Sequence, residues 1–390
     1  MQGEKIKEND KKYIVNMYAR FDLVIDHAKG ATAYDADGKR YIDLTSGIGV
    51  NSLGYCDSGW IEAVEDQLEK LQHASNLYYT KPGADVARKL VERTGMSKVL
   101  FANSGAEANE AAIKLVRKYG NLLAQKKRSS IVTLNGSFHG RTLATIAATG
   151  QEKVRRGFDP VTPGFYYCAP DDIDDMKRQI MMHDPVAVMM ELVQGEGGVN
   201  ALSPEFVKET FAICKKRGIA VIDDEVQTGV GRTGTLFAYE QYGVKPDIVT
   251  FAKGMGAGLP IGGAIVNEKF ADVFKPGDHG CTFGMNPVAC AGADYVLHTI
   301  NSDFLESVKG KAAYIREHLE QLKGVEETTG LGLMIGIVLR HMDAGDAVAT
   351  LLDNGVMALT AKDKVRLLPP LTISYDEIDR AMEVFDKVLG

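Results

Sequence analysis

The strongest constraint on the fold is a series of short apolar runs that alternate with helical segments after residue 98. The runs cover residues 99–102, 131–134, 186–190, 219–222 and 248–252. Apart from Thr133 and Thr250, the residues of these runs are apolar, which is typical of strands that are buried on both faces of a parallel sheet. Because helical segments separate the runs, the pattern predicts an α/β fold with a mostly parallel sheet covered on both sides.

Polar or small residues follow each of these runs. They are residues 103–105, 136–139, Glu191, 223–225 and Lys253. In open α/β sheets, ligands bind at the carboxyl ends of the strands. We therefore expect these groups to lie along one edge of the sheet and to form a site there.

The chain has 390 residues, which exceeds the size at which a single core usually stops growing. Residues 32–44 are typical of a hairpin of two short strands around an Asp-Gly turn. After about residue 293, three helical segments flank two further strand-like runs. We expect a large domain at residues 46–293 and a smaller α/β domain formed by residues 1–45 and 294–390.

Composition excludes several classes of function. A net charge of -7 argues against nucleic acid or an anionic membrane as the main partner. No run of about 18 apolar residues exists, and the first 13 residues lack the apolar core of a signal peptide. The five cysteines form no Cys-x-x-Cys pair and no zinc spacing with histidine. A cytoplasmic protein without a metal site is expected.

Lys253 lies between an apolar run and a loop with glycines at positions 254, 256, 258, 262 and 263. Burying a lysine is costly, so a lysine at the end of a core strand needs a reason. One reason is chemical, because a desolvated lysine has a lowered pKa and forms a Schiff base with a carbonyl. The alternative is that Lys253 only marks the point where the strand reaches solvent.

Residues 103–110 open a predicted helix, in which Ser104 and Glu107 fit a capping box. A helix amino end with a Ser-Gly-Ala turn favours phosphate, although an ordinary capped helix has the same pattern. In the next motif, Phe138 could stack on an aromatic ligand and Arg141 could bind a carboxylate. The alternative there is a core aromatic residue beside a surface arginine.

Asp223, Asp224 and Glu225 follow one another at the end of a predicted core strand. Three adjacent acids are electrostatically costly without a cation, which is either a metal or a protonated ring nitrogen. Residues 229–234 match Gly-x-Gly-x-x-Gly, but the preceding acids would repel a pyrophosphate, and the glycines do not follow the strand directly. We therefore interpret this motif as a structural turn.

Together these motifs resemble the class III, pyridoxal-phosphate-dependent aminotransferases of fold type I. The resemblance extends from about residue 34 to residue 370. Its most specific stretches are residues 75–80, 103–110, 138–142, 194–198, 224–234, Lys253 and 280–287. It implies the cofactor pyridoxal 5'-phosphate and a large domain with a mostly parallel seven-stranded sheet, plus a smaller α/β domain.

The resemblance also implies roles for residues at the cofactor. Lys253 would hold the cofactor as a Schiff base and then act as general acid and base, while Asp224 would pair with the pyridine nitrogen. The cofactor-binding set that it implies is Ser104, Gly105, Ala106, Phe138, Asp224, Glu225, Val226, Gln227, Lys253 and Thr282. Thr282 would reach the phosphate of the second subunit, so a homodimer with its active site at the interface is expected.

For the substrates, the resemblance makes Arg141 and Arg366 carboxylate-binding residues. Glu196 would pair with Arg366 in one half-reaction and release it in the other, and Cys281 would lie near the acylated amine. The chain departs from the family pattern at three places. Tyr55 replaces a histidine, residues 191–193 lack the usual proline, and Met285 adds bulk beside the Thr282 motif.

The function that the resemblance implies is transfer of the terminal amino group of N-acetylornithine to 2-oxoglutarate. The products would be N-acetylglutamate semialdehyde and glutamate, in arginine biosynthesis. Gly47 stands where ornithine-specific relatives have a tyrosine for the free α-amino group, which favours a blocked amine. Alternative donors are succinylornithine, succinyl-diaminopimelate, ornithine and 4-aminobutyrate. A remaining alternative is a non-catalytic regulatory protein that kept the same fold.

Overall fold

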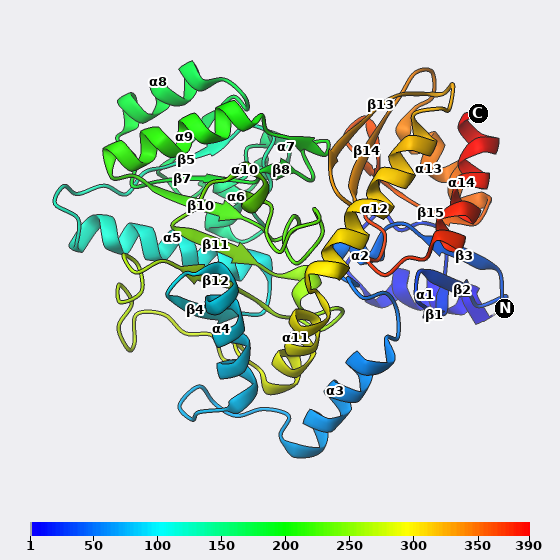
Figure 1. Ribbon diagram of the computed structural model, residues 1–390, viewed down its shortest axis with the longest axis horizontal. Helices are drawn as coiled ribbons and strands as arrows, with labels where there is room; N and C mark the ends of the chain where they lie inside the picture. The colour runs from blue at the N-terminus through cyan, green and yellow to red at the C-terminus, as the bar shows by residue number, and fades with distance from the viewer. Residues whose placement is uncertain (1) are drawn as a thin grey trace.

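A computed structural model of the protein describes residues 2–390. Its central element is a seven-stranded sheet with the order β4-β12-β11-β10-β7-β5-β6 (Figure 1). These strands are β4 (Lys98–Ala102), β5 (Ile131–Leu134), β6 (Phe165–Cys168), β7 (Ala187–Met190), β10 (Ala220–Asp224), β11 (Ile248–Phe251) and β12 (Gly262–Val266). Only β12 runs antiparallel to its neighbours β11 and β4. The predicted mostly parallel sheet is confirmed, and all five apolar runs are strands in it.

Two strands of this sheet, β6 and β12, were not among the predicted runs. Strand β6 has the sequence Phe-Tyr-Tyr-Cys, and β12 begins with two glycines. The glycines are required by the close approach of β4. A Cβ at Gly263 would lie 2.3 Å from the carbonyl oxygen of Leu100, and one at Gly262 would lie 2.6 Å from that of Ser104. Strand β12 therefore begins with two residues that have no side chain, and it lacks the apolar pattern by which strands are recognised in a sequence.

Helices cover both faces of the sheet, because successive side chains of each buried strand point to opposite sides. In β7, Val188 and Met190 pack in one cluster with side chains of α8 and α9. Ala187 and Met189 pack in a second cluster with side chains of α5. The helices of this part are α3 (Ser58–Lys70), α4 (Lys81–Thr94), α5 (Gly105–Leu122), α6 (Leu143–Ala148), α7 (Glu152–Arg155), α8 (Ile173–His183), α9 (Pro204–Arg217), α10 (Tyr239–Tyr242) and α11 (Pro287–Thr299).

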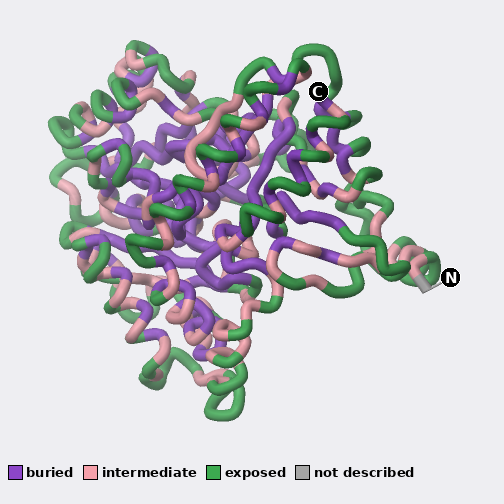
Figure 2. Tube along the Cα trace, turned by 45° about the vertical axis from the view of Figure 1, so that its right-hand side comes forward, coloured by how far each residue is buried: buried purple, intermediate pink, exposed green. Residues whose placement is uncertain are grey.

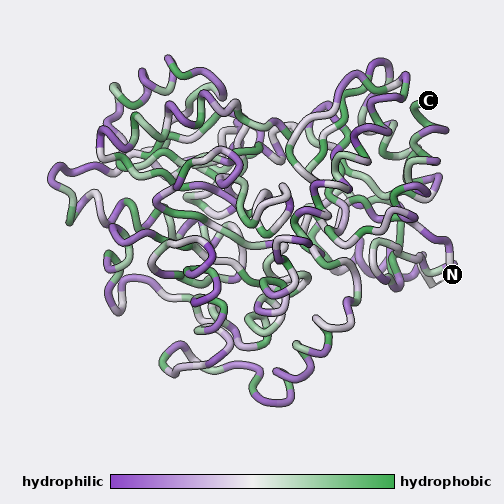
Figure 3. The backbone as a smooth tube through the Cα atoms, viewed as in Figure 1, coloured by the Kyte–Doolittle hydropathy of each residue, from purple (hydrophilic) through white to green (hydrophobic). Residues whose placement is uncertain are grey.

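Buried residues follow the central strands, whereas exposed residues follow the outer turns of the helices and the N-terminal segment (Figure 2). The hydropathy of the chain has a similar distribution, with hydrophilic residues along the outer helices (Figure 3). Within residues 2–390, no helix combines the length and the apolar character that crossing a membrane would require.

The N-terminal and C-terminal segments lie together on the other side of the molecule (Figure 1). The predicted hairpin is confirmed as the pair β2 (Thr32–Asp35) and β3 (Arg40–Asp43). Strand β1 (Ile25–Lys29) extends it on one side, and β15 (Val356–Met357) pairs with β3 on the other. A second sheet has the order β13-β14-β17-β16, with β13 (Val325–Leu331), β14 (Met334–Leu339), β16 (Leu359–Ala361) and β17 (Lys364–Leu367).

The remaining elements complete this part of the chain. They are α1 (Gln2–Tyr13), α12 (Ser302–Leu319), α13 (Ala344–Asp353) and α14 (Tyr375–Leu389), with α2 (Ser46–Gly49) and the short pair β8 (Val193–Gln194) and β9 (Asn200–Ala201) nearer the large sheet. Glu377 of α14 joins the two ends of the chain, since its Oε1 accepts hydrogen bonds from Ala31 N and Thr32 Oγ1. The division into domains at residues 46–293, 1–45 and 294–390 stays a prediction.

Candidate active site

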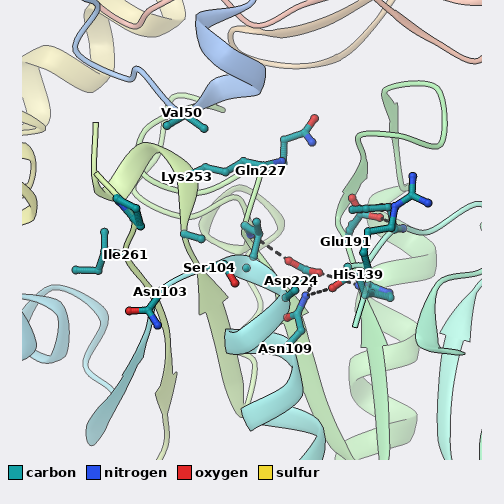
Figure 4. Close-up of a pocket in the computed structure, with 18 of the residues that line it drawn as sticks. Val50, Asn103, Ser104, Asn109, His139, Glu191, Asp224, Gln227, Lys253 and Ile261 are labelled. Atoms are coloured by element: carbon teal, nitrogen blue, oxygen red, sulfur yellow. Dashed lines mark hydrogen bonds and ion pairs between the residues drawn. The ribbon is translucent and has the colours of Figure 1, made fainter. Parts of the chain in front are cut away.

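A cavity of about 460 Å³ lies at the carboxyl ends of the central strands (Figure 4). That volume is within the range of sites for small ligands and cofactors. Its lining includes Ser104, Gly105, Ala106, Asn109, Phe138, His139, Arg141, Glu191, Asp224, Val226, Gln227 and Lys253. The prediction that the groups at the strand ends converge along one edge is confirmed for residues 103–105, Phe138, His139, Glu191, Asp224 and Lys253.

Lys253 follows β11 and begins the short 3-10 helix η1 (Lys253–Met255). Its φ of 45° lies in the left-handed region, which a residue with a side chain rarely adopts unless its surroundings impose it. The side chain is half-buried and lines the cavity. Desolvation lowers the pKa of Lys253, and the positive charge of Arg366 acts in the same direction while Glu196 opposes it. A lysine in this setting has the lowered pKa that a nucleophilic amine requires.

Asp224 ends β10 and is only 3% exposed. Its Oδ2 accepts a hydrogen bond from Asn109 Nδ2 at 2.7 Å and lies 2.8 Å from His139 Nδ1. Its Oδ1 accepts from Val226 N at 3.1 Å. Figure 4 shows these side chains converging from three different segments of the chain. The carboxylate is therefore held in one orientation at the cavity wall.

Helix α5 begins at this cavity with Gly105, and Ser104 is its N-cap. Ser104 Oγ accepts from Glu107 N at 3.2 Å, but the Glu107 carboxylate accepts from Asn103 N rather than from Ser104 N. The predicted capping box is thus only half formed. A Cβ at Gly105 would lie 2.5 Å from Val226 Cγ1, so only glycine permits this packing. The first N–H groups of a helix have no partner within it, so this end can bind an anion.

Phe138 and Arg141 lie on the loop that follows β5. The Arg141 guanidinium carbon is 5.4 Å from the centre of the Phe138 ring. Both residues line the cavity together with Val226 and Gln227. An aromatic ring, a branched apolar side chain and a guanidinium group here provide surfaces for a flat ligand and for a carboxylate.

Arg366 reaches this region from β17 in the C-terminal part of the chain. It is 3% exposed, and its Nη1 lies 2.5 Å from Glu196 Oε1. The same nitrogen is 3.4 Å from Gln227 Oε1, so the ion pair lies next to the cavity without lining it. Burial tends to raise the pKa of Glu196, but the charge of Arg366 outweighs that effect and lowers it.

The structure does not bring Glu225 to the cavity. Its carboxylate is buried on another side of the β10 end, where it accepts hydrogen bonds from Thr228 Oγ1 and Tyr239 N. Side chains alternate in direction along a strand and its extension, which separates Glu225 from Asp224. Glu225 is therefore not among the residues that line this cavity, although a contact with the cofactor is expected from the resemblance. Its hydrogen bonds to Thr228 and Tyr239 instead stabilise the fold behind the site.

Thr282 and Cys281 lie in a separate hollow of about 610 Å³. Asn103 Nδ2 is 3.1 Å from Cys281 Sγ, and Asn76 Nδ2 donates to the carbonyl oxygens of Cys281 and Gly284. Asn103 therefore lines the cavity around Lys253 and also contacts the loop that carries Thr282. The cavity around Lys253 does not include Thr282 of the same chain, and its predicted action on a second subunit stays a prediction.

Three residues of the site had no role in the sequence analysis: Asn109, His139 and Glu191. His139 and Glu191 were recognised only as groups at strand ends, and that position was the available signal. Asn109 is inside a helix and 115 positions from its partner Asp224. No local pattern could have shown that contact. His139 Nε2 and Asn109 Oδ1 are buried without a hydrogen-bond partner among residues 2–390.

Comparisons with known proteins agree with this geometry. Residues 13–389 match the family model Aminotransferase class-III. The chain is 48% identical to the acetylornithine aminotransferase of Haemophilus ducreyi, over 100% of both chains. It is 41% identical to that of Methanocaldococcus jannaschii, over 100% of this chain and 98% of the relative.

Two solved structures are also similar. An ornithine aminotransferase from Toxoplasma gondii, with partial occupancy of PLP at its active site, is 30% identical with a TM-score of 0.94, covering 99% of this chain and 94% of that one. The N-acetylornithine aminotransferase from Stenotrophomonas maltophilia is 32% identical with a TM-score of 0.84, covering 98% of both chains.

Proposed function

The chain belongs to the class III aminotransferase family, and we propose that it transfers the side-chain amino group of N2-acetyl-L-ornithine to 2-oxoglutarate. The products are N-acetyl-L-glutamate 5-semialdehyde and L-glutamate, a step of arginine biosynthesis. The observation that carries this proposal is a single cavity that joins Lys253, Asp224 and the amino end of α5. The donor follows from the full-length similarity to acetylornithine aminotransferases.

The cofactor of this family is pyridoxal 5'-phosphate, and the cavity fits its three chemical parts. The amino end of α5 suits the phosphate, Lys253 suits the aldehyde, and Asp224 suits the ring nitrogen. Gly105 supports this fit because any side chain there would displace Val226 from the ring position. When bound, the cofactor supplies a carbonyl for the amine and an aromatic ring that withdraws electrons from the reacting carbon.

The residues of this chain then have distinct tasks. Lys253 would hold the cofactor and would then, as a neutral amine, move the proton between the reacting carbon of the substrate and the cofactor. Asp224 would keep the ring nitrogen protonated, and Asn109 and His139 fix the orientation of the Asp224 carboxylate. Phe138 and Val226, which line the cavity, would cover the two faces of the cofactor ring and exclude water, and Gln227 would donate a hydrogen bond to the ring hydroxyl oxygen.

Recognition of two different substrates rests on two arginines. Arg141 binds the carboxylate that lies far from the reacting carbon, which is the α-carboxylate of N-acetylornithine and the γ-carboxylate of 2-oxoglutarate or glutamate. Arg366 stays paired with Glu196 when N-acetylornithine is bound and is released when the α-carboxylate of 2-oxoglutarate or glutamate, next to the reacting carbon, replaces Glu196. A buried arginine without a partner is costly, so a movable carboxylate allows one site to accept both substrates.

The proposal includes a homodimer whose site is completed by Thr282 of the partner subunit. The residues around the hollow that holds Thr282 support it, because several large apolar side chains there face solvent in the single chain. Leu77 is 88% exposed, Tyr79 is fully exposed, and Phe283 is also exposed. Apolar patches of this kind mark protein interfaces.

A cytoplasmic location is part of the same proposal and is supported by five free cysteines.

The test is a visible absorbance spectrum of the purified protein, before and after addition of N-acetylornithine without a keto acid. We expect a yellow band that bleaches with this donor and returns when 2-oxoglutarate is added. Lys253→Ala is expected to lack the band. A band that N-acetylornithine leaves unchanged would refute the donor but not the reaction class. Absence of the band after addition of pyridoxal 5'-phosphate would refute both.

A further inference from the structure

Glu191 is a buried carboxylate at the end of β7 that lines the cavity and has no role in the reaction described above. It is 4% exposed. Burying a carboxylate is costly unless hydrogen bonds compensate for the lost water. Its contacts therefore indicate why the chain keeps a charged group at this position.

Both oxygens of Glu191 accept hydrogen bonds from backbone N–H groups of two different loops. Oε1 accepts from Phe138 N at 2.8 Å, and Oε2 accepts from Gly195 N at 3.2 Å. An ionised carboxylate can accept at both oxygens, whereas a neutral amide of the same shape can accept at only one. Glu191 thus connects the loop after β5 with the turn after β8.

The loop after β5 contains Arg141, which forms one of the two carboxylate-binding ends of the proposed substrate pocket. Phe138, whose N–H donates to Glu191, also stacks beneath the Arg141 guanidinium group, with 5.4 Å between the guanidinium carbon and the ring centre. The position of the Phe138 backbone therefore influences the position of Arg141.

The turn after β8 contains Glu196, whose partner Arg366 forms the other carboxylate-binding end of the pocket. Gly195, whose N–H donates to Glu191, directly precedes Glu196, and Glu196 pairs with Arg366. A Cβ at Gly195 would lie 2.3 Å from Gln227 Oε1, so this turn packs closely against the residue that also contacts Arg366. The Glu191 carboxylate therefore holds the backbone beside the movable Glu196.

We propose that Glu191 is a positioning residue that fixes the distance between Arg141 and the Arg366–Glu196 pair. It thereby sets the length of dicarboxylate that the pocket accepts. This inference rests on the proposed function, because that function assigns the two arginines to the two carboxylates of 2-oxoglutarate. Burial raises the pKa of Glu191 to about 7, while the two N–H groups favour the ionised form.

The test compares a dicarboxylate probe, glutarate, with a monocarboxylate probe, butyrate, on the cofactor-loaded enzyme. Glutarate needs both ends at the correct distance, whereas butyrate needs only one. We expect Glu191→Gln to weaken inhibition by glutarate by about 10- to 100-fold, the range expected for misplacement by a fraction of an ångström to 1 Å. Inhibition by butyrate should change much less, and KM for 2-oxoglutarate should rise by a larger factor than kcat falls.

A matched control is Asp175→Asn. Asp175 is also buried and also accepts a backbone hydrogen bond, from Ala169 N at 2.8 Å, but it belongs to α8 outside the cavity. The Asp175→Asn variant should leave the inhibition constants of glutarate and butyrate unchanged. If Glu191→Gln does not fold, Glu191→Asp is the second variant, because it keeps the charge but is too short to reach both loops.

Equal weakening of glutarate and butyrate would overturn the proposal and leave Glu191 with a general structural role. Unchanged affinity for both probes would overturn it as well. Failure of the proposed function has a different signature, since the unaltered enzyme would then not bind glutarate and would not use 2-oxoglutarate.

Discussion

At the scale of single residues, the orientation of Asp224 depends on donors that come from elsewhere in the chain. Asn109 on α5 and His139 on the loop after β5 both contact Oδ2, and Val226 N binds Oδ1. Asn109 Nδ2 also donates to the carbonyl oxygen of His139 at 2.8 Å, which ties the helix to that loop. Asn109 therefore stabilises the arrangement as well as the carboxylate.

The first prediction concerns Asn109. Asn109→Ala removes a hydrogen bond to a charged group, which is worth about 1.5–3 kcal/mol. We expect kcat to fall by at least about tenfold and the affinity for pyridoxal 5'-phosphate to weaken, because Asp224 is no longer fixed. Steady-state kinetics and a cofactor titration measure these effects. Asn354→Ala, which loses only a hydrogen bond to Thr350 O on α13, is the control. Unchanged values for Asn109→Ala would contradict the assigned role.

The second prediction concerns Glu196. Removing one partner of a buried ion pair leaves the other charge without compensation, at a cost of about 2–5 kcal/mol. In Glu196→Ala, the α-carboxylate of glutamate can still pair with Arg366, but N-acetylornithine has no carboxylate next to its reacting carbon. We expect the ratio of kcat/KM values to shift toward glutamate by about tenfold or more. Single-turnover measurements of each half-reaction give this ratio. Equal losses in both half-reactions would refute the exchange of partners at Arg366.

At the scale of elements, β10 carries a buried pair of acids behind the site. Asp223 and Glu225 are both fully buried, and both oxygens of Asp223 lack a hydrogen-bond donor among residues 2–390. Burial raises the pKa of Asp223 well above its usual value, and the nearby charge of Glu225 adds to this effect. Burial also raises the pKa of Glu225 to about 7. The folded strand therefore holds protons that the unfolded chain releases.

The third prediction follows from this difference in proton binding. Between about pH 4 and pH 7, the unfolded chain binds fewer protons at these carboxyls than the folded chain does, so their contribution to stability falls as pH rises. Asp223→Asn supplies an N–H donor to Glu225 and removes a buried carboxyl group that must either keep its proton or carry an uncompensated charge. We expect a gain of about 1–3 kcal/mol at pH 8 and a smaller gain at pH 5. Thermal denaturation at both pH values measures it, with the exposed Asp37→Asn as control. A larger gain at pH 5 would contradict the argument.

The fourth prediction concerns glycines in two kinds of element. In β12, a Cβ at Gly263 would lie 2.3 Å from Leu100 O and 2.7 Å from Phe251 Cζ. Gly263→Ala should therefore destabilise the protein by about 1–3 kcal/mol or more, because backbone atoms cannot yield. In α12, the nearest atom to a Cβ at Gly310 is Tyr375 Oη at 3.4 Å. Gly310→Ala should stabilise by about 0.5–1 kcal/mol, since alanine favours a helix. Urea denaturation distinguishes the two signs, and equal effects would refute the packing of β12.

The same elements explain which parts of the fold and site could be predicted from the sequence. Strands β4, β5, β7, β10 and β11 carry largely apolar runs, so their existence was predictable and their ends were predictable to within about two residues. Strand β12 could not be recognised, because its glycines serve a neighbour that lies far away in the sequence. The polar groups at the strand ends, such as Asp224 and Lys253, were predictable as well, because they follow the apolar runs. The contacts between Asn109 and Asp224, and between Glu191 and two loops, depend on tertiary packing that no local pattern encodes.

At the scale of the whole molecule, a buried arginine joins the large sheet to the C-terminal strands. Arg232 Nη1 donates to the carbonyl oxygens of Leu333 and Pro369, at 3.1 and 2.5 Å, and Nη2 lies 3.4 Å from Ser46 Oγ. Pro369 follows the strand that carries Arg366. The Gly-x-Gly-x-x-Gly motif around Arg232 therefore acts as a structural turn, as the sequence predicted, and it anchors the segment that follows Arg366.

The last prediction concerns two chains at once. In a symmetric dimer in which Thr282 serves the partner's site, each site takes Lys253 from one subunit and Thr282 from the other. Thr282→Ala and Lys253→Ala homodimers then each lack a complete site at limiting cofactor. A dimer with one subunit of each kind has one complete site, made of the Lys253 of the first variant and the Thr282 of the second. Random mixing of subunits places half of the chains in such dimers, so activity should recover to about a quarter of the unaltered level.

Subunits are exchanged by dilution and reconcentration of the mixed variants, and activity is measured at limiting pyridoxal 5'-phosphate. Sedimentation velocity confirms that dimers have formed again. If Thr282 instead served its own chain's site, every mixed dimer would lack either Thr282 or Lys253 at each site, and mixing would restore nothing. The recovered activity therefore distinguishes a site that is shared between subunits from one that each chain completes alone, because no change in the stability of either variant can create a complete site.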